Sequence, residues 1–254
     1  MVFMGSKRRY AKYIVPILQR TIDQNNINLY IEPFVGGANI IDKIRCENRY
    51  GFDRSDTLIA LLSTAANNFD DVMKDGNREL WDKGKAYVKD GIMPEDMTLA
   101  EIGAMEFFAS YSNGGFPRGY AKNTKERNYY NEAYRNMATQ APSLKGIKFK
   151  CQNYWELDSN IQNAVIYCDP PYANTKTYGY ANQSKMDYTH FWNWVRELSE
   201  NNYVFVSEQS APDDFEAIWT QDVKRTTNKE NNFKAVENLF IYKNDKKLDF
   251  LRKI

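Results

Sequence analysis

The amino-acid sequence predicts a Rossmann-like α/β fold, in which a doubly wound sheet carries helices on both faces and is interrupted by an inserted, mainly helical lobe. Three observations predict it: a glycine-rich turn directly after the first strand, alternating strands and helices over much of the chain, and a long middle stretch without strand alternation. Because 254 residues suffice for one such domain with an insertion, we expect a main domain of residues 1–60 and 145–254 and an inserted region of residues 61–144.

The first half of the main domain is predicted to be a β-α-β unit. A strand at Leu29–Glu32 follows a polar turn and ends at Pro33, just before a Gly-Gly turn. A short helix is expected at 38–45, and a second strand at 50–52 ends at Asp53. Helical character begins again at residue 58.

The second half of the main domain continues this alternation. Strands are expected at 146–151, 164–168, 203–206 and 237–242, and helices at 190–199 and 215–219. The strand 164–168 is apolar enough to be a buried parallel strand. In the helix 190–199, the aromatic residues Phe191, Trp192 and Trp194 stand at helical spacing, which indicates that they and the adjacent His190 pack in the core. We assign no catalytic role to His190.

Composition excludes several classes of protein. A hydrophobic share of 43% and a charged share of 26% are typical of a folded domain. Three scattered cysteines and one histidine form neither a disulfide framework nor a zinc-ligand spacing, so we expect no metal and a reducing, cytoplasmic location. Because no stretch approaches the roughly 18 apolar residues of a membrane span and no apolar signal segment opens the chain, we expect no membrane partner.

Charge is unevenly distributed along the chain. The formal net charge is only +1, but residues 113–150 contain eight basic and two acidic side chains, a local net charge of +6. A basic patch of this kind is one signature of nucleic-acid binding, although a solvated surface gives the same pattern.

The first group of residues with chemical potential follows the first two strands. It comprises Glu32-Pro-Phe-Val-Gly-Gly37, which includes Phe34 and Gly36, and Asp53 at the end of the second strand. Glycines let a backbone approach a ligand closely, and an acidic side chain one strand over can accept hydrogen bonds from ribose hydroxyls. The pattern therefore indicates a nucleoside site, while a tight turn with an incidental aspartate remains an alternative. The absence of a full G-x-G-x-x-G pattern disfavours a nicotinamide or flavin enzyme.

The second group, Asp169-Pro-Pro-Tyr172, follows the buried strand 164–168 where open α/β sheets bind ligands. The Asp169 carboxylate and the Pro170 carbonyl could each accept one hydrogen of an exocyclic amine, because Pro170 and Pro171 fix the backbone and donate no hydrogen bond. Tyr172 could stack on a flat ring. A loop that merely ends a strand is the alternative.

The segments Tyr30-Ile-Glu-Pro-Phe-Val-Gly-Gly37 and Tyr167-Cys-Asp-Pro-Pro-Tyr172, with Gly5-Ser6-Lys7 ahead of them, resemble in kind and order the motifs of the Dam-like DNA N6-adenine methyltransferases. The resemblance spans nearly the whole chain. It implies the Rossmann-like sheet of an S-adenosylmethionine-dependent methyltransferase. In this sheet Lys7 and Phe3 would help to bind the cofactor, and Asp53 would hold its ribose. The implied cofactor site comprises Phe3, Lys7, Glu32, Phe34, Gly36, Gly37, Asp53 and Asp169. This chain has Phe3 where tryptophan is frequent, and Gly-Gly-Ala-Asn where Gly-x-Gly is common.

The same resemblance makes the inserted region a target-recognition lobe. Its glycine- and aromatic-rich loop offers Asn113, Phe116, Arg118 and Tyr120 for DNA contact, because arginine can bind guanine edges and an aromatic ring can enter the base stack. Arg225 and Lys229 in a late segment are candidates for phosphate binding. For each of these residues a solvated surface position is the alternative.

The function expected from these features is site-specific methylation of adenine N6 in double-stranded DNA, with catalytic residues Asp169, Pro170, Pro171 and Tyr172. The adenine would swing out of the duplex to reach them. The alternatives are cytosine N4 methylation, amine methylation of RNA or of a small molecule, and a catalytically silent relative that binds DNA or cofactor. Asp169 favours adenine, since a serine commonly stands there in cytosine-N4 enzymes. A monomer is expected.

Overall fold

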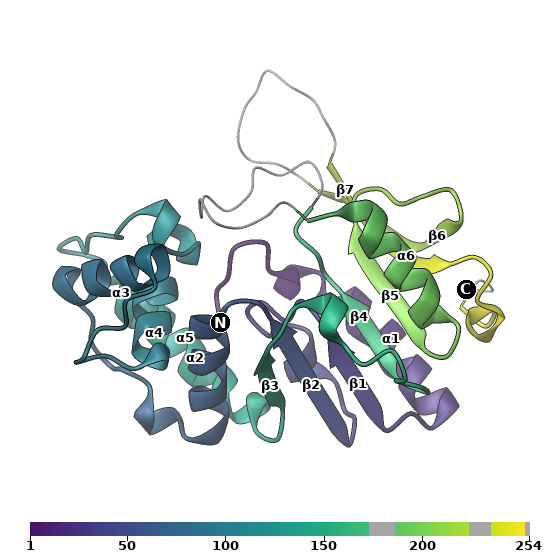
Figure 1. Cartoon of the computed structure of the whole chain (residues 1–254), viewed down its shortest axis with the longest axis horizontal. Helices are drawn as coiled ribbons and strands as arrows, with labels where there is room; N and C mark the ends of the chain where they lie inside the picture. The colour runs from purple at the N-terminus through teal and green to yellow at the C-terminus, as the bar shows by residue number, and fades with distance from the viewer. Residues whose placement is uncertain (173–185, 224–234, 252–254) are drawn as a thin grey trace.

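A computed structural model describes residues 1–172, 186–223 and 235–251 of the chain. They form a seven-stranded sheet in the order β3-β2-β1-β4-β5-β7-β6, flanked on one side by a lobe of helices (Figure 1). The strands are β1 (Leu29–Glu32), β2 (Asn48–Asp53), β3 (Lys148–Cys151), β4 (Val165–Cys168), β5 (Tyr203–Glu208), β6 (Phe215–Val223) and β7 (Ala235–Tyr242).

Strands β1 to β5 run parallel to one another, whereas β7 lies antiparallel to β5 and β6 antiparallel to β7. The Rossmann-like sheet expected from the sequence is therefore confirmed, with an antiparallel hairpin at one edge. Because β7 runs against β5, Glu237 near the start of β7 comes to the sheet edge where β4 and β5 end, and Asn238 pairs with Glu208. The ends of five parallel strands and the start of β7 thus meet at one edge.

The two faces of the sheet pack on different helices, because successive strand residues point to opposite sides. Val165 and Tyr167 of β4 face the core that contains α1 (Ala11–Asn25), while Ile166 and Cys168 face the core around α6 (Tyr188–Ser199). In Figure 1, α6 lies in front of the sheet and α1 behind it. The buried aromatic residues of α6 confirm the predicted core packing, since Phe191, Trp192 and Trp194 are all buried.

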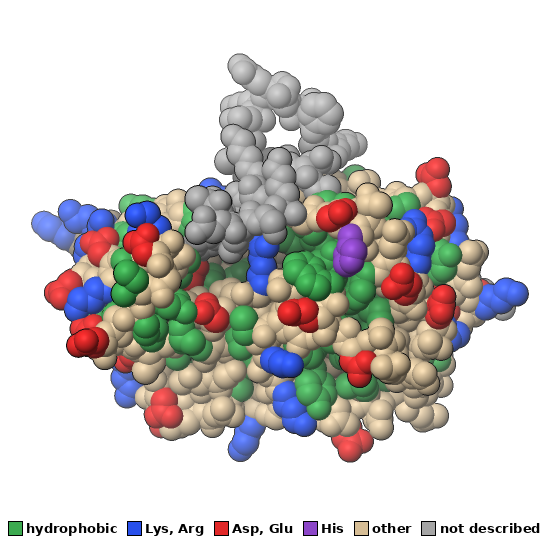
Figure 2. Space-filling model, viewed as in Figure 1, with side chains coloured by type: hydrophobic (Ala, Val, Ile, Leu, Met, Phe, Trp, Pro, Cys, Tyr) green, Lys and Arg blue, Asp and Glu red, His purple; other side chains and the backbone are tan. Residues whose placement is uncertain are grey.

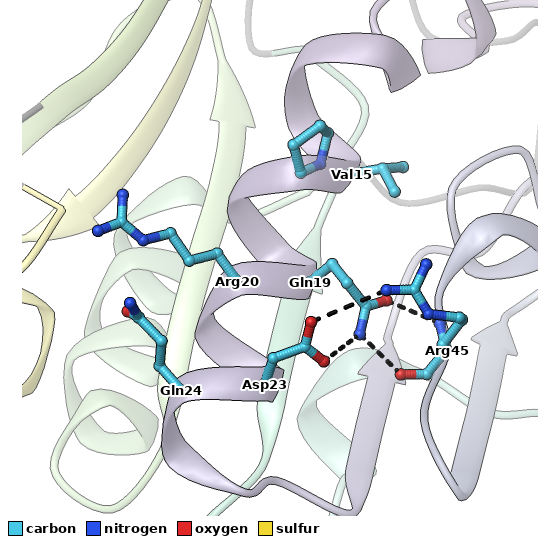
Figure 3. A pocket seen from close by; sticks show the side chains of 7 residues that line it. Val15, Gln19, Arg20, Asp23, Gln24 and Arg45 are labelled. Carbon is cyan, nitrogen blue, oxygen red and sulfur yellow. Dashed lines mark hydrogen bonds and ion pairs between the residues drawn. The ribbon is translucent and has the colours of Figure 1, made fainter.

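Helix α1 was not predicted from the sequence, and the side chain of Gln19 explains how it is held. Its amide nitrogen donates to the Arg45 carbonyl (2.9 Å) and its amide oxygen accepts from the Arg45 backbone N–H (2.8 Å). The same nitrogen also donates to Asp23 one turn later (2.8 Å), as the close view of this shallow pocket shows (Figure 3). Gln19 thereby pairs with the backbone of the segment before β2, much as a neighbouring strand would.

The region between β2 and β3 is helical, as expected. It contains α2 (Asp56–Asn67), α3 (Arg78–Asp90), α4 (Leu99–Phe108) and α5 (Tyr129–Leu144). Thr57 of α2 donates a hydrogen bond to the buried Glu106 of α4 (2.6 Å). The two helices cross closely at Gly103, where a Cβ atom would lie 2.2 Å from the Thr57 carbonyl oxygen. The expected boundary at residue 60 falls inside α2.

Two predicted helices are wrong. Residues 38–45 contain only a single 3-10 turn at Ile41–Lys43, because Ala38 adopts a positive φ of 55°, which a right-handed helix excludes, and the four consecutive residues from Ala38 are all buried. Residues 215–219 belong to β6. A β-bulge between Ala217 and Trp219 breaks the two-residue alternation of this strand, and the resulting spacing imitates a helix.

The surface of the molecule mixes both signs of charge. On the face shown in Figure 2, acidic and basic side chains are interspersed over the helical lobe and the sheet, and hydrophobic side chains gather near the centre. The eight basic residues counted between 113 and 150 are all exposed. None of the described helices is long and apolar enough to cross a membrane.

Candidate active site

A cleft of about 1680 Å³ opens at the edge of the sheet where the parallel strands end. This volume exceeds the roughly 300–1,000 Å³ of a typical small-molecule pocket, so it has room for a second group besides a cofactor. The N-terminal segment, the Gly-Gly turn after β1, the end of β2, the corner after β4 and the start of β7 all contribute to its walls. Of the proposed site residues, the cleft brings together Phe3, Lys7, Glu32, Phe34, Gly36, Gly37, Asp53, Asn113, Arg118, Asp169, Pro170, Pro171 and Tyr172.

The N-terminal segment places Lys7 at the floor of the cleft. The turn closed by the hydrogen bond from the Ser6 N–H to the Phe3 carbonyl (3.1 Å) leads into a 3-10 turn that starts at Lys7, and the Ser6 hydroxyl caps it. The Lys7 side chain is 4% exposed, and its ammonium group lies 2.5 Å from Asp169 Oδ1. Burial by itself lowers the pKa of Lys7, but the nearby carboxylates Asp169 and Glu237 outweigh burial and leave it raised. Lys7 is therefore charged, and it orients the carboxylate of Asp169.

The corner Asp169-Pro-Pro-Tyr172 directly follows β4. Pro170 is buried and Pro171 is exposed. Because the ring of each proline fixes its φ angle, the two prolines restrict the path of the backbone at the cleft. Burial raises the pKa of Asp169, and the adjacent Lys7 ammonium opposes that shift. The Tyr172 hydroxyl donates a 2.5 Å hydrogen bond to Oε2 of Glu237, and its ring centroid lies 4.6 Å from the Lys7 nitrogen. One end of the corner thus carries an oriented carboxylate and the other an anchored aromatic ring.

The Gly-Gly turn after β1 is packed against Phe3. Gly36 has a φ of 46°, and a Cβ atom on Gly37 would lie 2.6 Å from Phe3 Cβ and 2.7 Å from Asn39 Nδ2. Phe3 in turn packs on Phe107 of α4 at a centroid distance of 5.5 Å. The glycines are therefore required by close packing against Phe3, and their predicted approach to a ligand stays a prediction. Phe3 joins the turn to the helical lobe.

Two acidic residues stand at the ends of β1 and β2. Asp53 accepts hydrogen bonds from the backbone N–H groups of Gly36 (3.2 Å) and Ser55 (3.1 Å), and burial raises its pKa. Because an ionised carboxylate has about four acceptor sites, it retains capacity for further donors in the cleft. Glu32 is buried and accepts from the Tyr30 hydroxyl (2.7 Å), and burial raises the pKa of Glu32 well above its usual value.

Sequence reasoning missed an aromatic wall of the cleft after β3. Tyr154 packs against Phe34 at 5.3 Å, and its hydroxyl shares a 2.9 Å hydrogen bond with His190 Nδ1. Trp155 is 51% exposed beside it. His190 is exposed at the cleft and does not belong to the core, which corrects the interpretation of it as core packing. The sequence signal for this wall is the adjacent pair of aromatic residues shortly after a strand.

The predicted DNA-contacting residues divide into two groups. Arg118 is exposed and lines the cleft, while Asn113 lines it with its side-chain amide bonded to the Phe107 carbonyl (2.7 Å). Phe116 is 2% exposed and packs against Trp81 at 5.4 Å, so its predicted role as a DNA contact is corrected to support of the loop.

Tyr120 also packs against Trp81, at 5.8 Å, and its ring is only partly exposed. It packs on the same tryptophan as Phe116 and does not line the cleft. The remaining two candidates, Arg225 and Lys229, lie outside the described residues. Among the residues described, no group of three side chains suited to a metal ion was found.

Comparison with known protein families identifies the family of the chain. Residues 3–91 and 95–243 match the profile of the D12 class N6 adenine-specific DNA methyltransferases. The chain belongs to this family. The D12 match identifies the chain as an S-adenosylmethionine-dependent enzyme that methylates adenine N6 in DNA. It does not support the alternatives of cytosine N4 methylation, RNA methylation or a catalytically silent relative.

The other comparisons add little to the D12 assignment. Among solved structures, the rRNA methyltransferase aviRa from Streptomyces viridochromogenes at 2.4 Å is 8% identical, with 96% of this chain and 87% of that chain covered and a TM-score of 0.40. Its structure at 1.5 Å is 9% identical, with coverages of 95% and 86% and a TM-score of 0.41. A search of curated proteins returned no match.

The residues of the cleft fit the cofactor of a D12 enzyme. The close-packed glycine turn leaves no room for a side chain. The Asp53 carboxylate can accept from ribose hydroxyls, and Trp155 offers an exposed aromatic face for a base.

Proposed function

We propose that this enzyme methylates an adenine that has been flipped out of double-stranded DNA into the cleft, with Asp169, Pro170, Pro171 and Tyr172 as its catalytic residues. The observation that carries this proposal is the corner after β4, where a carboxylate oriented by Lys7 and an aromatic ring anchored by Glu237 face one cleft. Adenine N6 is inaccessible inside a stacked duplex, so extrusion of the base is required, at a cost of about a few kcal/mol.

Asp169 and Pro170 orient the acceptor amine. The carboxylate accepts one N6 hydrogen and the Pro170 carbonyl accepts the other, which directs the nitrogen lone pair toward the methyl donor. Tyr172 stacks on the adenine ring. Lys7 holds Asp169 in place and opposes the rise in its pKa, because the Lys7 ammonium group is buried against that carboxylate.

S-adenosylmethionine, when bound, supplies an activated methyl group on a sulfonium. The chain's own part is to bind and align: Gly36 and Gly37 allow close approach, Asp53 holds the ribose, and Phe3, Glu32 and Phe34 complete the site. Since the donor is already activated, alignment of the two reactants is the main contribution of these residues.

The inserted region, residues 61–144, is proposed to recognise the DNA target. Asn113 and Arg118 line the cleft from this lobe and are the residues proposed to meet DNA beside the extruded base. Arg118 is exposed, with its guanidinium 3.1 Å from Met4 Sδ, and can bind a phosphate or a guanine edge. A monomer and a cytoplasmic location stay predictions.

The decisive experiment incubates the purified enzyme with S-adenosylmethionine and mixed-sequence duplexes, then sequences the product DNA with a methylation-sensitive long-read method. We expect N6-methyladenine at one recurring sequence. Asp169→Ala should abolish transfer while DNA affinity stays within about threefold, because the carboxylate acts on the amine rather than on the duplex. Turnover near that of the wild type in this variant would refute the role of Asp169.

A second arm tests recognition by the inserted lobe. Arg118→Ala should weaken DNA binding and, if the side chain meets a phosphate, reduce the slope of log affinity against log salt by about one. Exposed Lys85, on the same lobe but away from the cleft lining, provides the matched control Lys85→Ala. Unchanged binding in Arg118→Ala would remove this loop from the interface.

A further inference from the structure

Glu237 is a buried acidic residue near the start of β7, and the proposed mechanism gives it no role beyond its contact with Tyr172. Its side chain is only 5% exposed, and it lies close to the apolar part of β7. One carboxylate oxygen, Oε2, accepts the 2.5 Å hydrogen bond from the Tyr172 hydroxyl. The other, Oε1, lies 3.7 Å from the Lys7 ammonium nitrogen and has no hydrogen-bond partner among the described residues.

These contacts close a ring of four side chains. Lys7 binds Asp169 at 2.5 Å, Lys7 also faces Glu237, and Glu237 holds Tyr172. Asp169 and Tyr172 are joined in turn by the two prolines of the corner. Both ends of a conformationally restricted corner are therefore tied, through Lys7 and Glu237, to two different parts of the chain, the N-terminal segment and β7.

The cost of burying this carboxylate argues that its contacts are specific. Burial raises the pKa of Glu237, while Lys7 and the hydrogen bond from Tyr172 oppose the shift. Neutralising Lys7 does not by itself require Glu237, because Asp169 already pairs with that ammonium at a shorter distance. What Glu237 adds is a connection between the ammonium and the Tyr172 ring, since each of its oxygens serves one of them.

We propose that Glu237 is a positioning residue for methyl transfer: its carboxylate sets the Tyr172 ring and the Lys7–Asp169 pair relative to each other, so that the acceptor ring and its amine are held together. The inference rests on the proposed function of Asp169 and Tyr172. Glu237 acts through Lys7 and Tyr172 and touches no reacting atom itself.

The test compares Glu237→Gln, Tyr172→Phe and the double variant in steady-state methylation of a duplex that carries the sequenced target. Glutamine keeps the shape but has one acceptor oxygen, so it cannot serve both partners. We expect kcat to fall about 10- to 100-fold in Glu237→Gln, as for loss of a hydrogen bond to a charged group. The KM for S-adenosylmethionine should change by less than about threefold, because the cofactor residues are untouched.

The double variant distinguishes positioning from unrelated damage. If Glu237 acts through the Tyr172 hydroxyl, Glu237→Gln should lower kcat less in the Tyr172→Phe background than in the wild type, and the two losses should not multiply. A second readout is the fluorescence of 2-aminopurine at the target position, whose increase on binding should shrink in Glu237→Gln while DNA affinity is retained. Glu197→Gln, an exposed change on α6, is the matched control and should behave as the wild type.

Two outcomes would overturn the inference: a kcat for Glu237→Gln within about twofold of the wild type, or fully multiplicative losses in the double variant. A lowered melting temperature with an unchanged kcat would assign Glu237 a structural role only and would also count against it. Failure of the proposed function is distinguishable, because Asp169→Ala would then retain turnover near that of the wild type.

Discussion

Replacing Lys7 with methionine tests the charge balance of the site. The side chain is 4% exposed and faces Asp169 at 2.5 Å and Glu237 at 3.7 Å. Methionine fills a similar volume but leaves two buried carboxylates next to each other without a cation. Removal of one partner from a buried ion pair costs about 3–5 kcal/mol. Because the Asp169 side chain retains 20% exposure and can reach water, we expect the lower end of this range.

The expected loss translates into a measurable change in melting temperature. For chains of 150–250 residues, 1 kcal/mol corresponds to about 2–4 °C, so Lys7→Met should melt roughly 6–12 °C below the wild type at pH 8. Exposed Lys12, whose ammonium lies 4.7 Å from the Tyr13 ring centroid, provides the control Lys12→Met, which should change stability by less than about 0.5 kcal/mol.

The sign of the pH dependence provides an independent check on Lys7→Met. Without Lys7, burial and mutual repulsion raise the pKa values of Asp169 and Glu237 further, so the folded variant binds protons that the unfolded chain releases. The variant should therefore lose stability as the pH rises, and its deficit should be smaller at pH 5 than at pH 8. Differential scanning fluorimetry at both pH values measures this. A deficit under about 2 °C at pH 8, or a larger one at pH 5, would refute the charge argument.

Two further predictions follow from the same site. Gly37→Ala should displace Phe3, since the new Cβ would lie 2.6 Å from Phe3 Cβ, and calorimetry should show at least about tenfold weaker S-adenosylmethionine binding. Gly91→Ala, where a Cβ meets nothing within 4 Å but φ is positive, controls for backbone strain and should bind normally. Burial raises the pKa of Glu208 from 4.5 to about 7, so its contribution to stability is full below pH 4.5 and is lost as the pH rises toward 7. Glu208→Gln should remove this loss, up to about 3 kcal/mol above pH 7, and identical urea midpoints at pH 5 and 8 for both proteins would contradict it.

Much of the fold followed from local patterns. The apolar run 164–168 indicated a buried strand, and the motif after it predicted the sheet edge of the cleft, because ligands of open α/β sheets bind where parallel strands end. The helix predicted at 215–219 failed because a β-bulge gives an edge strand the spacing of a helix. The predicted DNA contact of Phe116 was wrong for a different reason. An aromatic residue in a glycine-rich loop looks the same in the sequence whether its ring faces DNA or packs on Trp81.

The sequence by itself determined the sheet type, the glycine turn and the corner Asp169-Pro-Pro-Tyr172, because each depends on covalent and backbone constraints within a few residues. Only the tertiary structure decided which distant side chains complete that corner. Lys7 and Glu237 lie 230 positions apart in the sequence, and they meet because β7 runs antiparallel to β5 and starts at the edge where β4 ends. A contact of this kind depends on strand order and direction, which local periodicity does not encode.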